Sequence, residues 1–121
     1  MSVLICDPGF TWAAGHHLSL NRALLGGFRR NGIETHLLTH RGLDAKLVSE
    51  LDATPVFENH PATNHSNDPL CNWMENLFWN AEMLAKTLSR IVTGPGDVML
   101  WHSTCHSQLL AVAKFLESLK P

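Results

Sequence analysis

The chain is poor in charged residues, and this shortage excludes one class of partner. Charged residues make up 17% of the 121 residues, against about 25% in a typical globular protein, and the formal net charge is −2. This balance gives no electrostatic basis for binding nucleic acid. So low a charge fraction also suggests that a partner domain covers part of the surface.

Cysteine pairs and long apolar runs are lacking as well. Cys6, Cys71 and Cys105 form no close pair and no Cys-x-x-Cys motif, which indicates a reducing compartment. No apolar run approaches the roughly 20 residues that span a bilayer, and the first residues show no signal-peptide pattern. We therefore expect a cytoplasmic protein, with peripheral membrane contact left open.

The fingerprint of dinucleotide-binding proteins is missing too. No Gly-x-Gly-x-x-Gly follows the first strand, and the second predicted strand ends in Thr39-His40-Arg41 instead of the acid that would hold a ribose. A single glycine, Gly15, stands before the first predicted helix. There it allows an anion to approach the free N–H groups of the helix N-terminus.

What the sequence does contain is a regular alternation of strands and helices. Strands are predicted at residues 2–6, 33–39, 55–58 and 97–101, and helices at 16–31, 44–51, 69–92 and from 103 or 104 onward. This order predicts an α/β fold, a Rossmann-like three-layer sandwich with right-handed crossovers. We expect a parallel sheet of about four strands in the order 3-2-1-4.

The domain organisation follows from the same pattern. We expect residues 1–121 to form a single Rossmann-like domain, the N-terminal fragment of a larger two-domain protein. The sequence stops where a turn into a fifth strand is expected, and the strand at 97–101 would otherwise be a bare apolar edge. The alternative is a complete four-stranded domain, which could form a homodimer through that edge.

Seven of the eight histidines follow a predicted strand. Only His36 lies inside one; the others are His16, His17, His40, His60, His65, His102 and His106. The connections that enter the strands carry none. Open α/β sheets bind their ligands outside the carboxyl ends of the strands, so this asymmetry predicts a binding site at that end.

The loops after the first and fourth strands supply the candidate site residues. His102 is the predicted catalytic residue, since a histidine can orient a sugar hydroxyl or stabilise a leaving phosphate. The residues predicted to bind substrate are Gly15, His16, Trp12, His40 and Ser103.

Each of these assignments has a structural alternative. Bonds to nearby backbone explain the histidines equally well, and a hydrophobic plug over its loop does the same for Trp12. For Asp7 a helix-cap or turn role is favoured over catalysis, and for Arg41 a solvated side chain is favoured over contact with an anionic acceptor. His102-x-x-x-His106 has a spacing that can bind zinc, but the glutamate of His-Glu-x-x-His is absent, so no metal is expected.

Two stretches resemble a known family. They are Gly15-His16-His17 with Asn21-Arg22-Ala23-Leu24-Leu25, and Gly96-Asp97-Val98-Met99-Leu100-Trp101-His102. Together with Arg30-Asn31-Gly32-Ile33, they are similar to the N-terminal domain of GT-B-fold glycosyltransferases, especially the large retaining family that uses nucleotide sugars.

That resemblance implies a function in sugar transfer from a nucleotide-sugar donor to an acceptor. The chain would be the acceptor-side domain, with the nucleotide sugar as substrate and no separate cofactor. The donor-binding domain would lie in a missing C-terminal half, so this chain alone is expected to be inactive. Two alternatives remain: a flavodoxin-like or receiver-like binding module, and a metal-dependent hydrolase built on the histidines.

Overall fold

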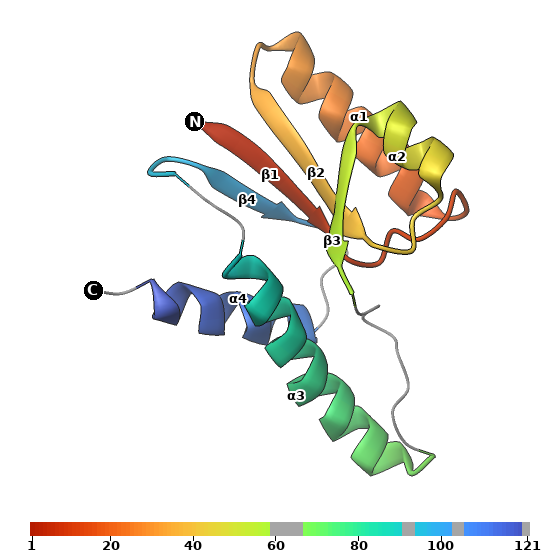
Figure 1. The fold of residues 1–121 in the computed structure, drawn as a ribbon, viewed down its shortest axis with the longest axis vertical. Coiled ribbons are helices and arrows are strands. Elements are labelled where there is room, and N and C mark those ends of the chain that lie inside the picture. The colour runs from red at the N-terminus through yellow and green to blue at the C-terminus, as the bar shows by residue number, and fades with distance from the viewer. Residues whose placement is uncertain (59–66, 91–93, 103–105, 120–121) are drawn as a thin grey trace. The chain divides into compact units, whose positions relative to one another are not determined.

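The structure, a computed structural model, describes residues 1–58, 67–90, 94–102 and 106–119 (Figure 1). The chain divides into two compact units. The sheet unit comprises Met1–Glu58 and Thr93–Ser103, and the helical unit comprises Asn59–Val92 and Thr104–Pro121. A single domain over residues 1–121 stays a prediction.

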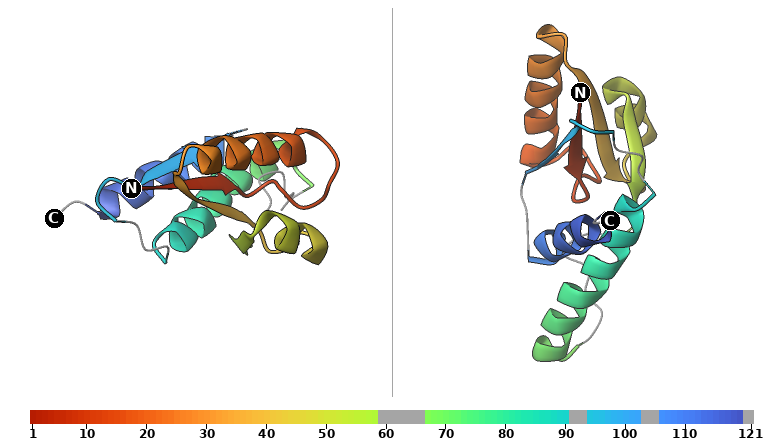
Figure 2. Two further views of the ribbon diagram at one scale, coloured as in Figure 1. Left: turned by 90° about the horizontal axis from the view of Figure 1, so that it is seen from above. Right: turned by 90° about the vertical axis from the view of Figure 1, so that its left-hand side faces the viewer.

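The sheet unit contains four parallel strands and two helices. They are β1 (Ser2–Asp7), α1 (His16–Arg30), β2 (Glu34–His40), α2 (Ala45–Leu51), β3 (Ala53–Phe57) and β4 (Val98–Trp101). The strands are ordered β3-β2-β1-β4, and every neighbouring pair is parallel. The predicted Rossmann-like α/β fold and strand order are therefore confirmed. Figure 2 shows α1 running alongside the strands.

Alternation along β1 separates two buried faces of the sheet. Val3 and Ile5 belong to an apolar cluster that α1 and α2 join through Leu25, Leu47 and Leu51. Because side chains alternate along a strand, Asp7 lies on this same face, next to the start of α1. β1 is thus apolar where the helix covers it and acidic where it ends.

Leu4 and Cys6 are buried on the opposite face of β1. Burial, with the negative charge of Asp7 as a smaller cause, raises the pKa of the Cys6 thiol to about 12. A thiol with so high a pKa is not a nucleophile at neutral pH. Cys6 is therefore a packing residue, as expected of a cysteine in an apolar strand.

Helix ends follow the predicted signals. Asp44 accepts a hydrogen bond from Lys46 N–H at 2.9 Å, and Asp68 accepts one from Cys71 N–H at 2.8 Å. At the end of α1, Gly32 has φ +68°, and Ile33 N–H donates to Phe28 C=O at 3.1 Å. This is the left-handed stop expected of a glycine after a helix.

β3 begins earlier than the predicted residue 55. Asp52 adopts the left-handed conformation (φ 53°) directly after α2, so the chain enters the strand at Ala53. Pro55 then lies within β3, which is an edge strand in the described sheet, where its missing N–H is tolerated. The pairing with β2 shifts register between Thr39 and His40, next to this proline.

The helical unit consists of α3 (Pro69–Leu88) and α4 (His106–Ser118), which pack against each other. α3 ends before the predicted residue 92. Ser89 is its C-cap residue, and Arg90 N–H donates to Thr87 C=O at 3.0 Å, which is an i→i−3 turn bond and not the i→i−4 bond of an α-helix. The predicted start of α4 at 103 or 104 lies outside the described residues. Among the described helices, none has the length and apolarity needed to cross a bilayer.

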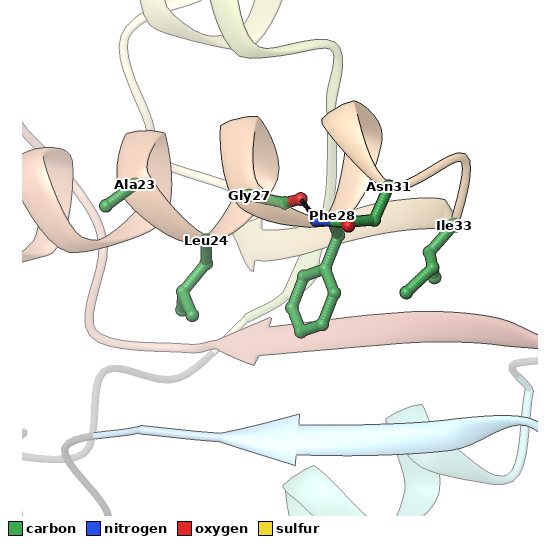
Figure 3. A pocket seen from close by; sticks show the side chains of 6 residues that line it. All are labelled: Ala23, Leu24, Gly27, Phe28, Asn31 and Ile33. Carbon is green, nitrogen blue, oxygen red and sulfur yellow. Dashed lines mark hydrogen bonds between the residues drawn. The ribbon is translucent and has the colours of Figure 1, made fainter.

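A shallow groove of about 290 Å³ lies on the C-terminal half of α1 (Figure 3). In the figure Leu24, Phe28 and Ile33 extend from this segment toward the strands, and the remaining lining residues are Ala23, Gly27 and Asn31. The groove is apolar and is lined only by residues 23–33. It is therefore separate from the loops that follow the strands.

Substitution of Gly15, directly before α1, tests the backbone conformation of the first loop. Its φ of 80° and ψ of −166° lie in a region that is open essentially only to glycine, although a Cβ there would meet no atom within 4 Å. We predict that Gly15→Ala lowers the free energy of unfolding by about 1–3 kcal/mol through backbone strain alone. Urea denaturation followed by circular dichroism measures this.

Gly27→Ala is the matched control, because Gly27 lies within the C-terminal half of α1 and a Cβ there also meets nothing within 4 Å. Since alanine is the better helix former, this variant should gain up to about 1 kcal/mol. Equal effects of the two substitutions would contradict the assigned conformation of Gly15.

Candidate functional site

A buried polar network lies at the carboxyl end of β1, and Asp7 is its centre. Asp7 is 1% exposed, and Asn21 beside it is fully buried. Asp7 Oδ2 accepts a hydrogen bond from Asn21 Nδ2 at 2.7 Å. His17 Nδ1 lies 3.0 Å from Oδ1 and 2.9 Å from Oδ2 of the same carboxylate.

His102, from the end of β4, completes this network. Its Nε2 lies 2.9 Å from Asn21 Oδ1 and 3.3 Å from Asp7 Oδ2. We name the four residues Asp7, His17, Asn21 and His102 the Asp7 network. Since β1 and β4 are paired and parallel, the segments that follow them emerge at the same edge of the sheet.

Helix α1 supplies two members of the Asp7 network, because residues one helical turn apart lie on the same face. His17 and Asn21 are four residues apart on α1, and Leu25, four residues further, belongs to the apolar cluster. These positions form one stripe, which faces the sheet. The stripe is polar in the first turns, where it meets Asp7, and apolar beyond them.

Hydrogen-bond complementarity fixes the protons of the network. A carboxylate only accepts hydrogen bonds, so His17 must carry its proton on Nδ1, and Asn21 must present its amide NH₂ to Asp7. Asn21 Oδ1 then faces His102 and accepts from His102 Nε2–H. Each of these buried polar atoms therefore has a partner.

The outward nitrogen of the His17 ring is not used by the Asp7 network. Its Nε2 has no hydrogen-bond partner among the described residues, and it is not among their buried unsatisfied atoms. When the ring is neutral, the proton on Nδ1 leaves a lone pair on Nε2. The ring stacks on His16 with centroids 4.4 Å apart, and a Cβ on Gly9 would come within 3.1 Å of its Cε1. His17 is thus held in place, with an acceptor nitrogen at the surface.

His102 is kept uncharged by its surroundings. Burial lowers the pKa of its imidazole below 6.5, and the positive charges that His17 and His16 can carry lower it further, against the opposing effect of Asp7. Its side chain is 11% exposed. At neutral pH, His102 is therefore a neutral hydrogen-bonding group.

The predicted site residues have different outcomes. Gly15 is the N-cap residue of α1, as expected of a glycine at a helix N-terminus. His16 is exposed and stacks on His17, and His102 belongs to the Asp7 network. The structure thus brings Gly15, His16 and His102 to one edge of the sheet. Their roles in binding and catalysis stay predictions.

The remaining candidate residues lie apart from the Asp7 network or outside the residues that the structure describes. His40 Nδ1 accepts from Gly42 N–H at 2.8 Å, and its Nε2 lies 3.0 Å from Glu58 C=O. These bonds to backbone match the structural alternative for this histidine. Trp12 is 68% exposed, so it is not a plug over the loop. Ser103 lies outside the described residues, as does the side chain of His106.

Two members of the Asp7 network correct the sequence interpretation. Asp7 does begin a turn, since Phe10 N–H donates to its backbone C=O at 3.2 Å, but its carboxylate also binds side chains of α1. Asn21 belongs to no motif that points to a site. The signal was present, because Asn21 occupies a core-facing position between His17 and Leu25, where an unpaired amide would be costly. Arg41, as expected, is a surface side chain, paired with Glu58 at 2.6 Å.

Substitution of Asn21 tests whether the Asp7 network is buried and hydrogen-bonded. We predict that Asn21→Ala lowers the free energy of unfolding by at least about 2 kcal/mol, because Asp7 and His102 both lose a buried partner. Ser19→Ala, on the exposed side of the same helix, should change it by less than about 0.5 kcal/mol. Urea denaturation compares the two variants. Equal stability of both would show that Asn21 is not part of a buried network.

No family model, curated protein or solved structure shows a significant match to this chain. A function is therefore best argued from the chemistry of the Asp7 network and from its position at the end of the sheet.

Proposed function

We propose that the sheet unit is the acceptor-side domain of a GT-B-type glycosyltransferase, which transfers a sugar from a nucleotide donor to an acceptor. One observation carries this proposal. The Asp7 network holds oriented hydrogen-bonding groups at the carboxyl ends of β1 and β4, beside the N-terminus of α1. Ligands of open α/β sheets bind at this position.

The chemistry of the network suits a sugar hydroxyl. A hydroxyl can donate a hydrogen bond to the outward Nε2 of His17, whose ring is fixed by Asp7 and by the stack on His16. A ring fixed before the ligand arrives loses little conformational freedom on binding. Asp7 and Asn21 act as positioning residues, since both are buried behind the ring.

The start of α1 suits the phosphates of a nucleotide sugar. Gly15 precedes the first free N–H groups of the helix, and no acidic residue lies in the first turn. Free N–H groups and the helix dipole favour a negative charge there. An acceptor hydroxyl and a donor phosphate would then meet at one edge of the sheet.

The same geometry speaks against a receiver-like module. A receiver needs accessible paired acids after its first strand and an acid after its third, whereas Asp7 stands alone after β1. Asp7 is 1% exposed, and its carboxylate is engaged by His17 and Asn21. A buried carboxylate with two donors in place is a structural anchor, so hydroxyl binding by His17 suits this site better.

Ligand binding by this chain tests the proposal without any turnover. We predict that a hexose or nucleotide-sugar panel shifts the backbone NMR signals of residues 9–17 and of His102. His17→Gln should weaken the binding about 3- to 10-fold, the value of one hydrogen bond. The matched control is His36→Gln, because His36 is exposed in β2 and pairs with Glu34 at 3.0 Å.

Sugar transfer by this chain alone should be undetectable, because the donor-binding acid is expected in a second domain. The proposal is wrong if no member of the panel shifts these signals, or if the shifts are confined to the groove at residues 23–33.

A further inference from the structure

We propose that Asp7, His17 and His102 bind a divalent transition-metal ion of the zinc class. One carboxylate oxygen and two imidazole nitrogens, one from each residue, lie within 4.8 Å of one another. The three residues come from the end of β1, the first turn of α1 and the segment after β4. This inference goes beyond sugar transfer and does not depend on it.

The spacing of the ligand atoms suits one ion. Asp7 Oδ2 lies 2.9 Å from His17 Nδ1 and 3.3 Å from His102 Nε2. Two ligands about 2.1 Å from a zinc ion and separated by these distances enclose angles of roughly 90–105°. These two angles lie close to the octahedral and tetrahedral values.

Both imidazoles can offer a lone pair to the ion. In the metal-free network, the protons on His17 Nδ1 and His102 Nε2 point to oxygen atoms. When the ion binds, each ring can keep its proton by moving it to its other nitrogen, and on His17 that nitrogen has no partner among the described residues. The ring stays neutral, and the ion takes the place of the two protons.

The electrostatics favour a cation at this point. The Asp7 carboxylate is almost completely buried, and a nearby positive charge offsets the cost of that burial. Asn21 Nδ2, 2.7 Å from Asp7 Oδ2, would remain as an outer partner that orients the carboxylate. Three protein ligands leave at least one coordination position for water or for a ligand oxygen.

The donor set selects the kind of ion. Two imidazoles and one carboxylate suit Zn²⁺, Co²⁺, Ni²⁺ or Fe²⁺, whereas Mg²⁺ and Ca²⁺ prefer sites made of oxygen. The site also differs from the His102-x-x-x-His106 pair that the sequence suggests. Its partners for His102 come from β1 and α1, far away in the sequence.

The test is a Zn²⁺ titration of the chelator-treated chain, followed by calorimetry and by competition with a chromophoric chelator. We expect one ion per chain, with a dissociation constant on the order of 1 µM or tighter. His17→Gln and His102→Gln should each weaken binding at least about 10-fold. His36→Gln, which removes an exposed histidine outside the cluster, should leave binding unchanged.

A Co²⁺ titration of the unmodified chain keeps the result independent of variant folding. Paramagnetic broadening should be centred on Asp7, His17 and His102, and ligand-field absorption should reach its maximum at one ion per chain. The inference is overturned if no ion binds, if broadening is centred on other residues, or if well-folded His17→Gln binds zinc as tightly as the original.

Discussion

The burial of the Asp7 carboxylate is the constraint on which the rest of the site depends. A buried carboxylate without partners costs several kcal/mol, so the fold has to bring donors to it. It does so directly with His17 and Asn21 from α1, while His102, from the segment after β4, donates to the Asn21 amide oxygen. One acidic side chain thereby fixes the start of α1, the end of β1 and the end of β4 relative to one another.

This constraint links packing to function. The stripe of α1 that faces the sheet is apolar at Leu25 and polar at His17 and Asn21, so one helix seals the core and also orients the site. Gly15 directly precedes α1 and adopts a backbone conformation that is open essentially only to glycine. The network holds His17 firmly while one ring nitrogen stays available, which is the property that both the proposed sugar site and the proposed metal site use.

The fold could be predicted from the sequence because its signals are local. The alternation of apolar patterns predicts the strands and helices, and their ends are predicted by capping residues such as Asp44, Asp68 and Gly32. The preference for right-handed crossovers predicts the strand order. The position of the site was also predictable, since His16 and His102 follow strands. Its internal arrangement was not, because it depends on which atoms of distant residues meet. Nothing in the sequence around Asp7 and Asn21 shows that their side chains meet, because this contact forms only when α1 packs on β1.

The tautomeric state of His17 tests the central claim most directly. Long-range ¹H–¹⁵N NMR of the metal-free chain at neutral pH distinguishes the two ring nitrogens. A buried Asp7 carboxylate that accepts from His17 predicts a protonated Nδ1 and an unprotonated Nε2, with this preference lost in Asp7→Asn. A His17 ring protonated mainly on Nε2, or a ring unchanged by Asp7→Asn, would contradict the account.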